Sequence, residues 1–125
     1  MRSLWTHYIS ARSRETIIAT KLESKFQADT LAQIKQLFPG CHVFKQDAAQ
    51  LQGIPDILIL YYDKWAMLEF KRRTTSTRRP NQDYYVDLFD SWSYAAFIYP
   101  ENKEAILHEL QQALSPRRAA RRPQR

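Results

Sequence analysis

Hydrophobic and polar residues alternate along this chain with a spacing that changes from helical to extended and back. Between residues 14 and 38 the apolar positions recur at close to helical spacing, at Ile18, Leu22, Phe26, Leu31, Ile34 and Phe38, which predicts an amphipathic helix. Pro39 and Gly40 follow and end it. Beyond them the pattern predicts strands at 41–47, 55–62, 65–72 and 94–99 and helices at 81–92 and 101–114. The order α-β-β-β-α-β-α is typical of an α/β domain with a mixed β-sheet flanked by helices.

The predicted hairpin at residues 53–73, GIPDILILYYDKWAMLEFKRR, contains charged residues among its apolar ones. If residues 63–64 form a two-residue loop, Asp56 lies opposite Lys71 in the ladder. Alternation then puts Asp56, Glu69 and Lys71 on the same face, whereas a longer loop would change the pairing and keep Glu69 and Lys71 together. The opposite face is apolar and is predicted to face the core, with Ile57, Ile59, Tyr61, Ala66, Leu68 and Phe70.

Two carboxylates and an ammonium group at one end of a sheet suit the hydrolysis of a phosphodiester. Two carboxylates about one strand spacing apart can bind a hard cation such as Mg²⁺. That cation lowers the pKa of a bound water and offsets charge in the transition state, while a nearby ammonium group orients the water or stabilises negative charge. Asp56 and Glu69 are therefore the predicted metal ligands and Lys71 a predicted catalytic residue. The alternative is a surface Asp–Lys pair near a glutamate on a half-exposed sheet.

The charge of the chain favours a polyanionic partner, because its 125 residues carry a net charge of +6. The segment 115–125 holds five arginines and no acid. Its Pro, Ala and Arg content offers little to bury, so we expect one domain at 1–114 and a disordered tail at 115–125. The tail is either a solubilising extension or an arm that contacts phosphate through Arg117, Arg118, Arg121 and Arg122. A second basic cluster directly follows the hairpin and is predicted to hold a polyanionic partner beside the metal: Arg72, Arg73, Arg78 and Arg79.

Other classes of protein find less support in the sequence. The single cysteine, Cys41, excludes an internal disulfide and a zinc site made of cysteines alone. No apolar run approaches the roughly 18 residues that a membrane span needs, and residues 1–15 lack the apolar block of a signal peptide. We therefore expect no membrane partner and a cytoplasmic protein. The three histidines, His7, His42 and His108, are scattered without the spacing of a zinc site.

The charged hairpin resembles the core of the PD-(D/E)xK nuclease superfamily. Pro55-Asp56 matches the PD of that motif, and Glu69-Phe70-Lys71 matches its E-x-K. With Gln82 in the following helix, the order G-x-PD, E-x-K, Q is similar to the virus-type replication-repair nuclease (VRR-NUC) branch or to a related phage Holliday-junction resolvase. The resemblance covers about residues 15–114 and rests on a short motif.

The resemblance implies a restriction-endonuclease-like core, dependence on Mg²⁺ or Mn²⁺, and cleavage of DNA, often by a homodimer. It implies catalytic roles for Glu23, where many members carry a further acid, and for Gln82. Glu23 is otherwise a solvated glutamate at the edge of a helix, and Gln82 an ordinary first-turn residue.

On this resemblance we expect a metal-dependent endonuclease that acts on branched DNA, such as a Holliday junction, or that nicks DNA. We expect it in the cytoplasm of a bacterial or phage-infected cell, or associated with the nucleoid. The alternative is a DNA-binding or assembly module that keeps the nuclease fold without the chemistry.

Overall fold

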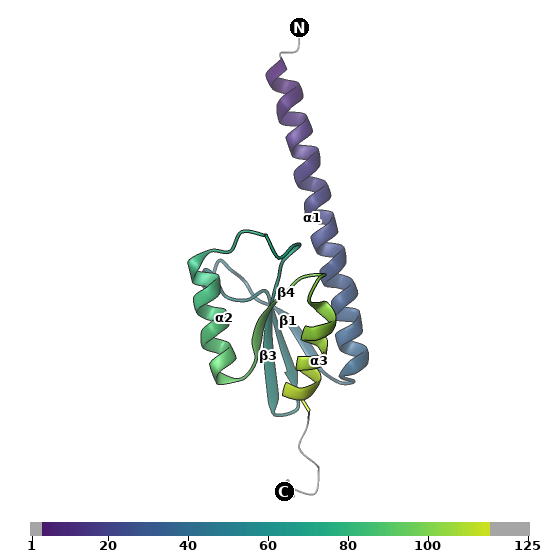
Figure 1. Ribbon diagram of the computed structural model, residues 1–125, viewed down its shortest axis with the longest axis vertical. Helices are drawn as coiled ribbons and strands as arrows, with labels where there is room; N and C mark the ends of the chain where they lie inside the picture. Colours follow the sequence, from purple (N-terminus) through teal and green to yellow (C-terminus); the bar gives the residue numbers. More distant parts are fainter. Residues whose placement is uncertain (1–3, 116–125) are drawn as a thin grey trace, which may run out of the picture.

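A computed structural model describes residues 4–115 of the chain, except the side chains of residues 4–13 and 16. The described residues form seven elements: α1 (Leu4–Leu37), β1 (His42–Lys45), β2 (Ile57–Tyr61), β3 (Lys64–Phe70), α2 (Pro80–Trp92), β4 (Ala95–Ile98) and α3 (Lys103–Ala113). Figure 1 shows the sheet between α2 on one side and α1 with α3 on the other. The predicted order of elements and the predicted α/β class are confirmed.

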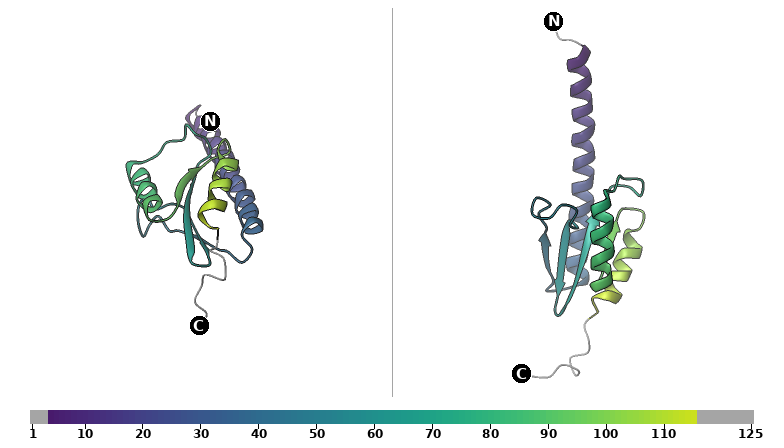
Figure 2. Two further views of the ribbon diagram at one scale, coloured as in Figure 1. Left: turned by 60° about the horizontal axis from the view of Figure 1, so that its bottom comes forward. Right: turned by 90° about the vertical axis from the view of Figure 1, so that its left-hand side faces the viewer.

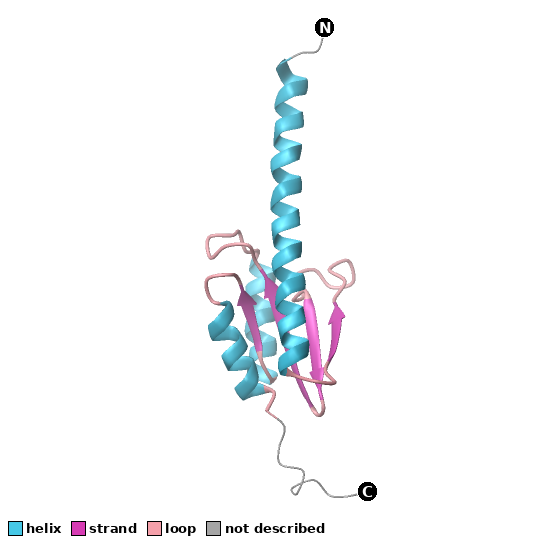
Figure 3. Cartoon of the chain, turned by 90° about the vertical axis from the view of Figure 1, so that its right-hand side faces the viewer, coloured by secondary structure: helices cyan, strands magenta, loops and turns pink. Residues whose placement is uncertain are grey.

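The four strands form one mixed sheet in the order β1-β2-β3-β4. The first two pairs are antiparallel, and β3 pairs with β4 in parallel. A parallel pair needs a crossover connection, which α2 supplies. In the right-hand view of Figure 2, α2 lies in front of the sheet, and in Figure 3 α1 crosses the opposite face. This arrangement is consistent with a restriction-endonuclease-like core.

The main core lies between the sheet and the pair α1 and α3. Ile34 and Phe38 reach it from the end of α1, and Leu110 and Leu114 from α3. The hairpin contributes the alternate positions that the sequence predicts, all fully buried: Ile57, Ile59, Ala66, Leu68 and Phe70. Tyr61 is half-buried at the edge of the same cluster. The α2 face buries a smaller cluster, made of Met67, Val86 and Ala95.

Helix α1 begins ten residues before the predicted start at residue 14, and its N-terminal part extends beyond the sheet (Figure 3). No glycine or proline occurs before Pro39, so nothing in the sequence stops the helix once its C-terminal part is packed. Ile18 and Leu22 are 58% and 52% exposed. They continue the apolar spacing of the helix without reaching the core, which α1 enters from Phe26 onwards.

The hairpin loop lies one residue earlier than predicted. Tyr61 pairs with Lys64, so the loop is residues 62–63, and its first residue has a φ of 56°. A positive φ at the first loop position is what tight hairpins require. The strands are also shorter than predicted, so that Asp56 and Lys71 lie just outside the ends of β2 and β3.

Two predictions concern features beyond these elements. Of the predicted tail at 115–125, all but Ser115 lies outside the described residues, including Arg117, Arg118, Arg121 and Arg122. Within residues 4–115, no helix combines the length and the hydropathy needed to cross a bilayer.

Candidate active site

The charged residues of the hairpin lie at its open end, near the start of α2. Ile57 pairs with Leu68, so Asp56 lies opposite Glu69. The prediction that Asp56 would lie opposite Lys71 is wrong. The pairing is displaced by two residues, however, which is one full period of a strand, so Asp56, Glu69 and Lys71 keep the common face that the sequence predicts.

The two carboxylates are held by reciprocal hydrogen bonds to the opposite backbone. The N–H of Asp56 donates to Oε2 of Glu69 at 3.0 Å, and the N–H of Phe70 donates to Oδ2 of Asp56 at 3.0 Å. These side chains thereby satisfy backbone donors where the β2–β3 ladder ends. Since each bond needs Asp56 opposite Glu69, the acid pair itself favours the observed register and explains why the loop is at residues 62–63.

Burial makes this acid pair hard to ionise completely. Glu69 is only 4% exposed, and burial, followed by the negative charge of Asp56, raises its pKa to about 7, although Lys71 opposes the shift. Burial also raises the pKa of Asp56, against the opposing effects of the Phe70 N–H and of Lys71. A divalent cation between the two groups would favour the ionised form of both.

Gln82, in the first turn of α2, joins the lysine to the acid pair. Its Nε2 donates to Oε1 of Glu69 at 2.8 Å, and its Oε1 accepts from Nζ of Lys71 at 3.0 Å. The same oxygen accepts from the N–H of Arg79 at 3.1 Å, which satisfies the backbone donor of the N-cap residue of α2. Nζ of Lys71 lies 3.8 Å from Oε1 of Glu69 and also donates to the carbonyl of Thr77 at 3.3 Å. Gln82 therefore caps the helix and also contacts both charged groups, so its contacts fit either of the roles that the sequence leaves open.

Glu23 approaches the acid pair from α1, on the other side of Asp56. It is exposed and lines a hollow of about 150 Å³ together with Asp56, Thr20, Ser24 and Gln27. No hydrogen bond joins Glu23 to Asp56 within the described residues. The motif does not include the three polar neighbours, although helical spacing could have indicated two of them: Thr20 and Gln27 lie three residues before and four residues after Glu23 and so share its side of the helix.

The donor set suits Mg²⁺ or Mn²⁺. Mg²⁺ is commonly bound by one or two carboxylates and keeps several waters, and Asp56 with Glu69 offers that number of carboxylates. Within residues 4–115 the N–H of Phe70 donates to Oδ2 of Asp56 and no N–H group donates to its Oδ1, so Oδ1 can bind a cation. In the same part of the chain, no three His, Cys, Asp or Glu side chains gather closely enough to hold an ion, so waters and a phosphate would complete the coordination.

The predicted basic cluster lies on the loop from β3 to α2, next to this acid pair. Nε of Arg78 lies 3.5 Å from Oδ1 of Asp83, and its guanidinium group lies 4.6 Å from the centre of the Phe97 ring. Among the described residues, the other three arginines form no ion pair: Arg72, Arg73 and Arg79. Their charges are therefore available for phosphate groups.

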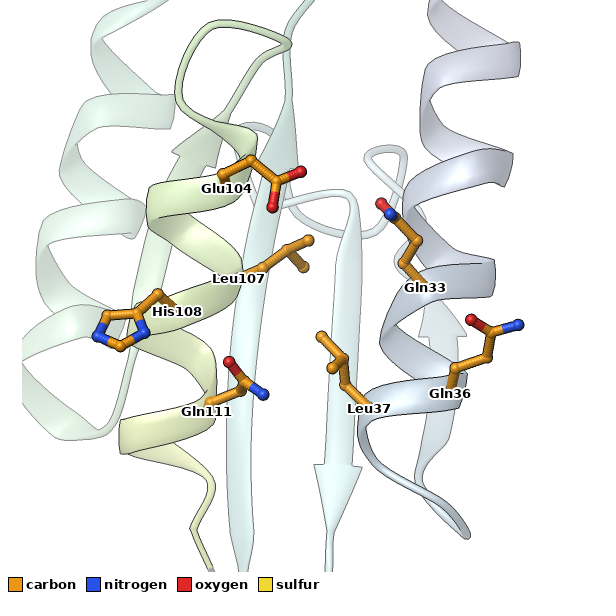
Figure 4. A pocket seen from close by; sticks show the side chains of 7 residues that line it. All are labelled: Gln33, Gln36, Leu37, Glu104, Leu107, His108 and Gln111. Atoms are coloured by element: carbon orange, nitrogen blue, oxygen red, sulfur yellow. The ribbon is translucent and has the colours of Figure 1, made fainter.

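A larger hollow, of about 470 Å³, lies between α1 and α3. Figure 4 shows Leu37 and Leu107 between the two helices, with amide side chains, Glu104 and His108 around them. No pair of acids meets there. The hollow offers volume without the arrangement of charged groups that hydrolysis needs, so the end of the β2–β3 hairpin is the candidate active site.

The fold and the site together define an α/β protein that carries a pair of carboxylates and a lysine at the end of a mixed sheet. A solved structure with partial similarity is that of Hjc, a Holliday junction resolvase from the archaeal hyperthermophile Archaeoglobus fulgidus. The two chains are 17% identical, with a TM-score of 0.43, over 61% of this chain and 67% of the archaeal one. No protein-family model matches the chain, and no curated protein matches it.

Proposed function

We propose that this chain is a metal-dependent deoxyribonuclease with a catalytic centre formed by Asp56, Glu69 and Lys71. The observation that carries the proposal is the acid pair, fixed by two hydrogen bonds of 3.0 Å, with a lysine 3.8 Å from one of its oxygens. A protein that only binds DNA gains nothing from a buried and a half-buried acid beside a phosphate, because they repel it. A hydrolase gains a cation site.

Each residue of the centre has a distinct task in this reaction. Asp56 and Glu69 would hold Mg²⁺ or Mn²⁺, which when bound lowers the pKa of a water and offsets charge on the phosphate. Lys71 places its ammonium group beside Glu69, where it can donate to a phosphate oxygen as negative charge develops. Gln82 positions Lys71 and Glu69 at the same time, and Glu23 would contribute a carboxylate from the α1 side of Asp56.

The finer proposal is a structure-specific endonuclease of the VRR-NUC or junction-resolvase type, supported by the motif order from Pro55-Asp56 to Gln82. A resolvase makes two symmetric cuts and so needs two copies of the centre, which a homodimer supplies. The exposed Ile18 and Leu22 on the projecting part of α1 offer an apolar surface for a second copy. The proposal places the protein in the cytoplasm of a bacterial or phage-infected cell, or at the nucleoid, with the tail at 115–125 as a further contact to DNA.

The second candidate is a DNA-binding or assembly module without catalytic activity. One observation favours it: Glu69 and Lys71 are both satisfied by Gln82, as they would be in a polar cluster that only stabilises the fold.

Cleavage assays separate the two candidates. We expect the wild type, with Mg²⁺ or Mn²⁺ and not with EDTA, to cut at least one of supercoiled plasmid, nicked duplex, flap and four-way junction. Asp56→Asn removes a charge, keeps an oxygen for the Phe70 N–H, and should abolish cutting. Asp87→Asn, at an exposed position of α2, is the matched control and should cut normally. Binding of these DNAs without cleavage of any of them would favour the module.

A further inference from the structure

A third hollow, of about 310 Å³, lies at the first turn of α2, and the proposed chemistry does not use it. Pro80, Asn81, Tyr84 and Tyr85 line it. Tyr84 is 61% exposed, and its ring meets that of Tyr85 edge-on, with the centroids 5.0 Å apart and the planes at 78°. An aromatic ring thus stands open to solvent near the start of α2.

Contacts with β3 and with the loop before β2 hold the residues that line this hollow in place. The ring of Tyr85 stacks on Phe89, at 5.7 Å and 20°, and Phe89 packs edge-on against Trp65 of β3 at 6.3 Å. Gly53, with a φ of 92°, lies so close to Asn81 that an added Cβ would come within 2.4 Å of the Asn81 Cβ. The loop before β2 therefore clamps the turn that forms the hollow.

The hollow is fixed relative to the candidate active site through Gln82. Gln82 lies between Asn81 and Tyr84 in the chain and contacts both Glu69 and Lys71. An α-helix rises about 1.5 Å and turns about 100° per residue, so Tyr84 lies about 3 Å farther along the axis than Gln82 but on nearly the opposite side of α2, while Tyr85 lies about 5 Å farther and about 60° round the helix from Gln82. A strand that passes the acid pair would reach Tyr84 by crossing the N-terminal end of α2, with Tyr85 on the nearer side.

The charge around the hollow suits a nucleic acid strand. Arg79 directly precedes Pro80, is exposed, and forms no ion pair with any described residue. Asp83 lies two residues before Tyr85, which places it on nearly the opposite side of the helix, where it is within 3.5 Å of Arg78. The hollow is therefore flanked by an unpaired cation, while the nearest acid of the first turn is engaged elsewhere.

We propose that this hollow binds an unpaired nucleobase, stacked on Tyr84, from the strand whose backbone passes the candidate active site. Aromatic rings beside basic residues are how proteins hold single strands, and the amide of Asn81 can bond to the edge of a base. The inference rests on the proposed nuclease function and deepens it. Bases in an intact duplex are stacked inside it, so the substrate is DNA with single-stranded nucleotides beside the cut, as in a flap, a bubble or an opened junction.

Binding without metal tests the proposal separately from cleavage. In EDTA, the affinity of the protein is measured for fluorescein-labelled oligothymidylate, for an abasic strand of the same length, and for a blunt duplex. We expect the wild type to prefer the base-bearing strand by about 5- to 150-fold. Tyr84→Ala should lose that preference and keep its affinity for the abasic strand and the duplex, whereas Tyr84→Trp should retain it. Tyr62→Ala is the matched control, because Tyr62 is 68% exposed in the hairpin loop.

Two results would overturn the proposal. One is equal affinity of the wild type for the base-bearing and abasic strands. The other is an equal loss of affinity for all three DNAs in Tyr84→Ala, which would point to a general defect. Cleavage with Mg²⁺ is scored independently. Base preference without any cleavage would sink the nuclease proposal and leave a single-strand binding site, while cleavage without base preference would sink only the role of the hollow.

Discussion

The two faces of the sheet differ in what they bury. Towards α1 and α3, alternate residues of β2 and β3 enter one large apolar cluster that includes Ile59 and Leu68. Towards α2, the same strands bury only a small cluster around Met67, and Glu69 is buried at its end. One face is packed to stabilise the fold, and the other accepts a buried acid.

Burial of the acids on the α2 face costs free energy, and it also places them beside the groups that they need. Burying carboxylates without a partner of opposite charge is unfavourable, so a site of this kind is tolerated where another face supplies most of the stability. The α2 face supplies the neighbours that the acids need, namely the amide of Gln82 and the ammonium group of Lys71. Changes at the acid pair should therefore affect activity more than stability, and changes in the large apolar cluster should affect stability more.

The largest effect is expected from Asp56→Asn. Cleavage in single turnover should fall by about 10³-fold or more, at the upper end of the losses seen for single polar groups in active sites. The free energy of unfolding of the metal-free protein near pH 8 should stay the same or rise by about 1 kcal/mol, because one of two repelling charges is gone. Urea unfolding measures the second quantity. Loss of stability together with activity would mean that Asp56 is chiefly structural.

A pair of neighbouring substitutions compares the faces directly. Leu68→Ala removes a fully buried side chain from the large cluster and should cost about 2–5 kcal/mol in the free energy of unfolding. Met67→Ala, one residue away and on the α2 face, should cost less, because the surrounding cluster is smaller and can close around the change. Equal costs in urea unfolding would show that the two faces contribute alike.

Lys71→Ala should affect chemistry more than DNA capture. We expect turnover at saturating DNA to fall about 10²- to 10³-fold, with the dissociation constant changed by no more than about 3-fold, since several arginines remain nearby. Arg73→Ala is the comparison. We expect it to weaken DNA binding slightly and to change turnover at saturating DNA less. A large loss of affinity with unchanged single-turnover cleavage would assign Lys71 to substrate binding instead.

The pH dependence of stability should report the buried acid. The pKa of Glu69 in the folded protein, about 7, is above its ordinary value of 4.5. Its contribution to stability is therefore fully present below pH 4.5 and is lost as the pH rises through 7, by about 3 kcal/mol in the metal-free protein.

Mg²⁺ should restore stability above pH 7, because it binds the ionised form. Urea unfolding from pH 4 to 9, with and without Mg²⁺, measures both effects. If Glu69→Gln shows the same pH profile as the wild type, the loss of stability arises elsewhere.

The sequence predicts much of this arrangement because its strongest signals have fixed periods. The common face of Asp56, Glu69 and Lys71 follows from the two-residue period of a strand and survives the change in register. The register itself depends on where the loop forms, and that depends on two hydrogen bonds between residues far apart in the chain. Composition gives no signal for those bonds.

The contacts of Gln82 and the exposure of the first part of α1 are two further features that the sequence alone does not predict. The sequence places Gln82 at a helix start, but its contacts with Glu69 and Lys71 arise only when α2 folds over β3. The helical spacing of Ile18 and Leu22 is real, yet it cannot show that the sheet ends before it reaches them. The spacing of apolar residues identifies the apolar face of a helix or strand, and tertiary packing determines which other element covers that face.

The smallest effects are expected from single basic residues and from the basic segment 115–125. Each phosphate contact contributes about 0.9 to the slope of log affinity against log salt on duplex DNA. Arg79→Ala should therefore lower that slope by about 0.9, and deletion of residues 115–125, which carry five arginines, should flatten it further. Both variants should still cleave at saturating DNA, because the acid pair lies elsewhere. Loss of single-turnover cleavage in the folded, DNA-saturated deletion variant would instead make the tail part of the active site and extend the catalytic face beyond the sheet.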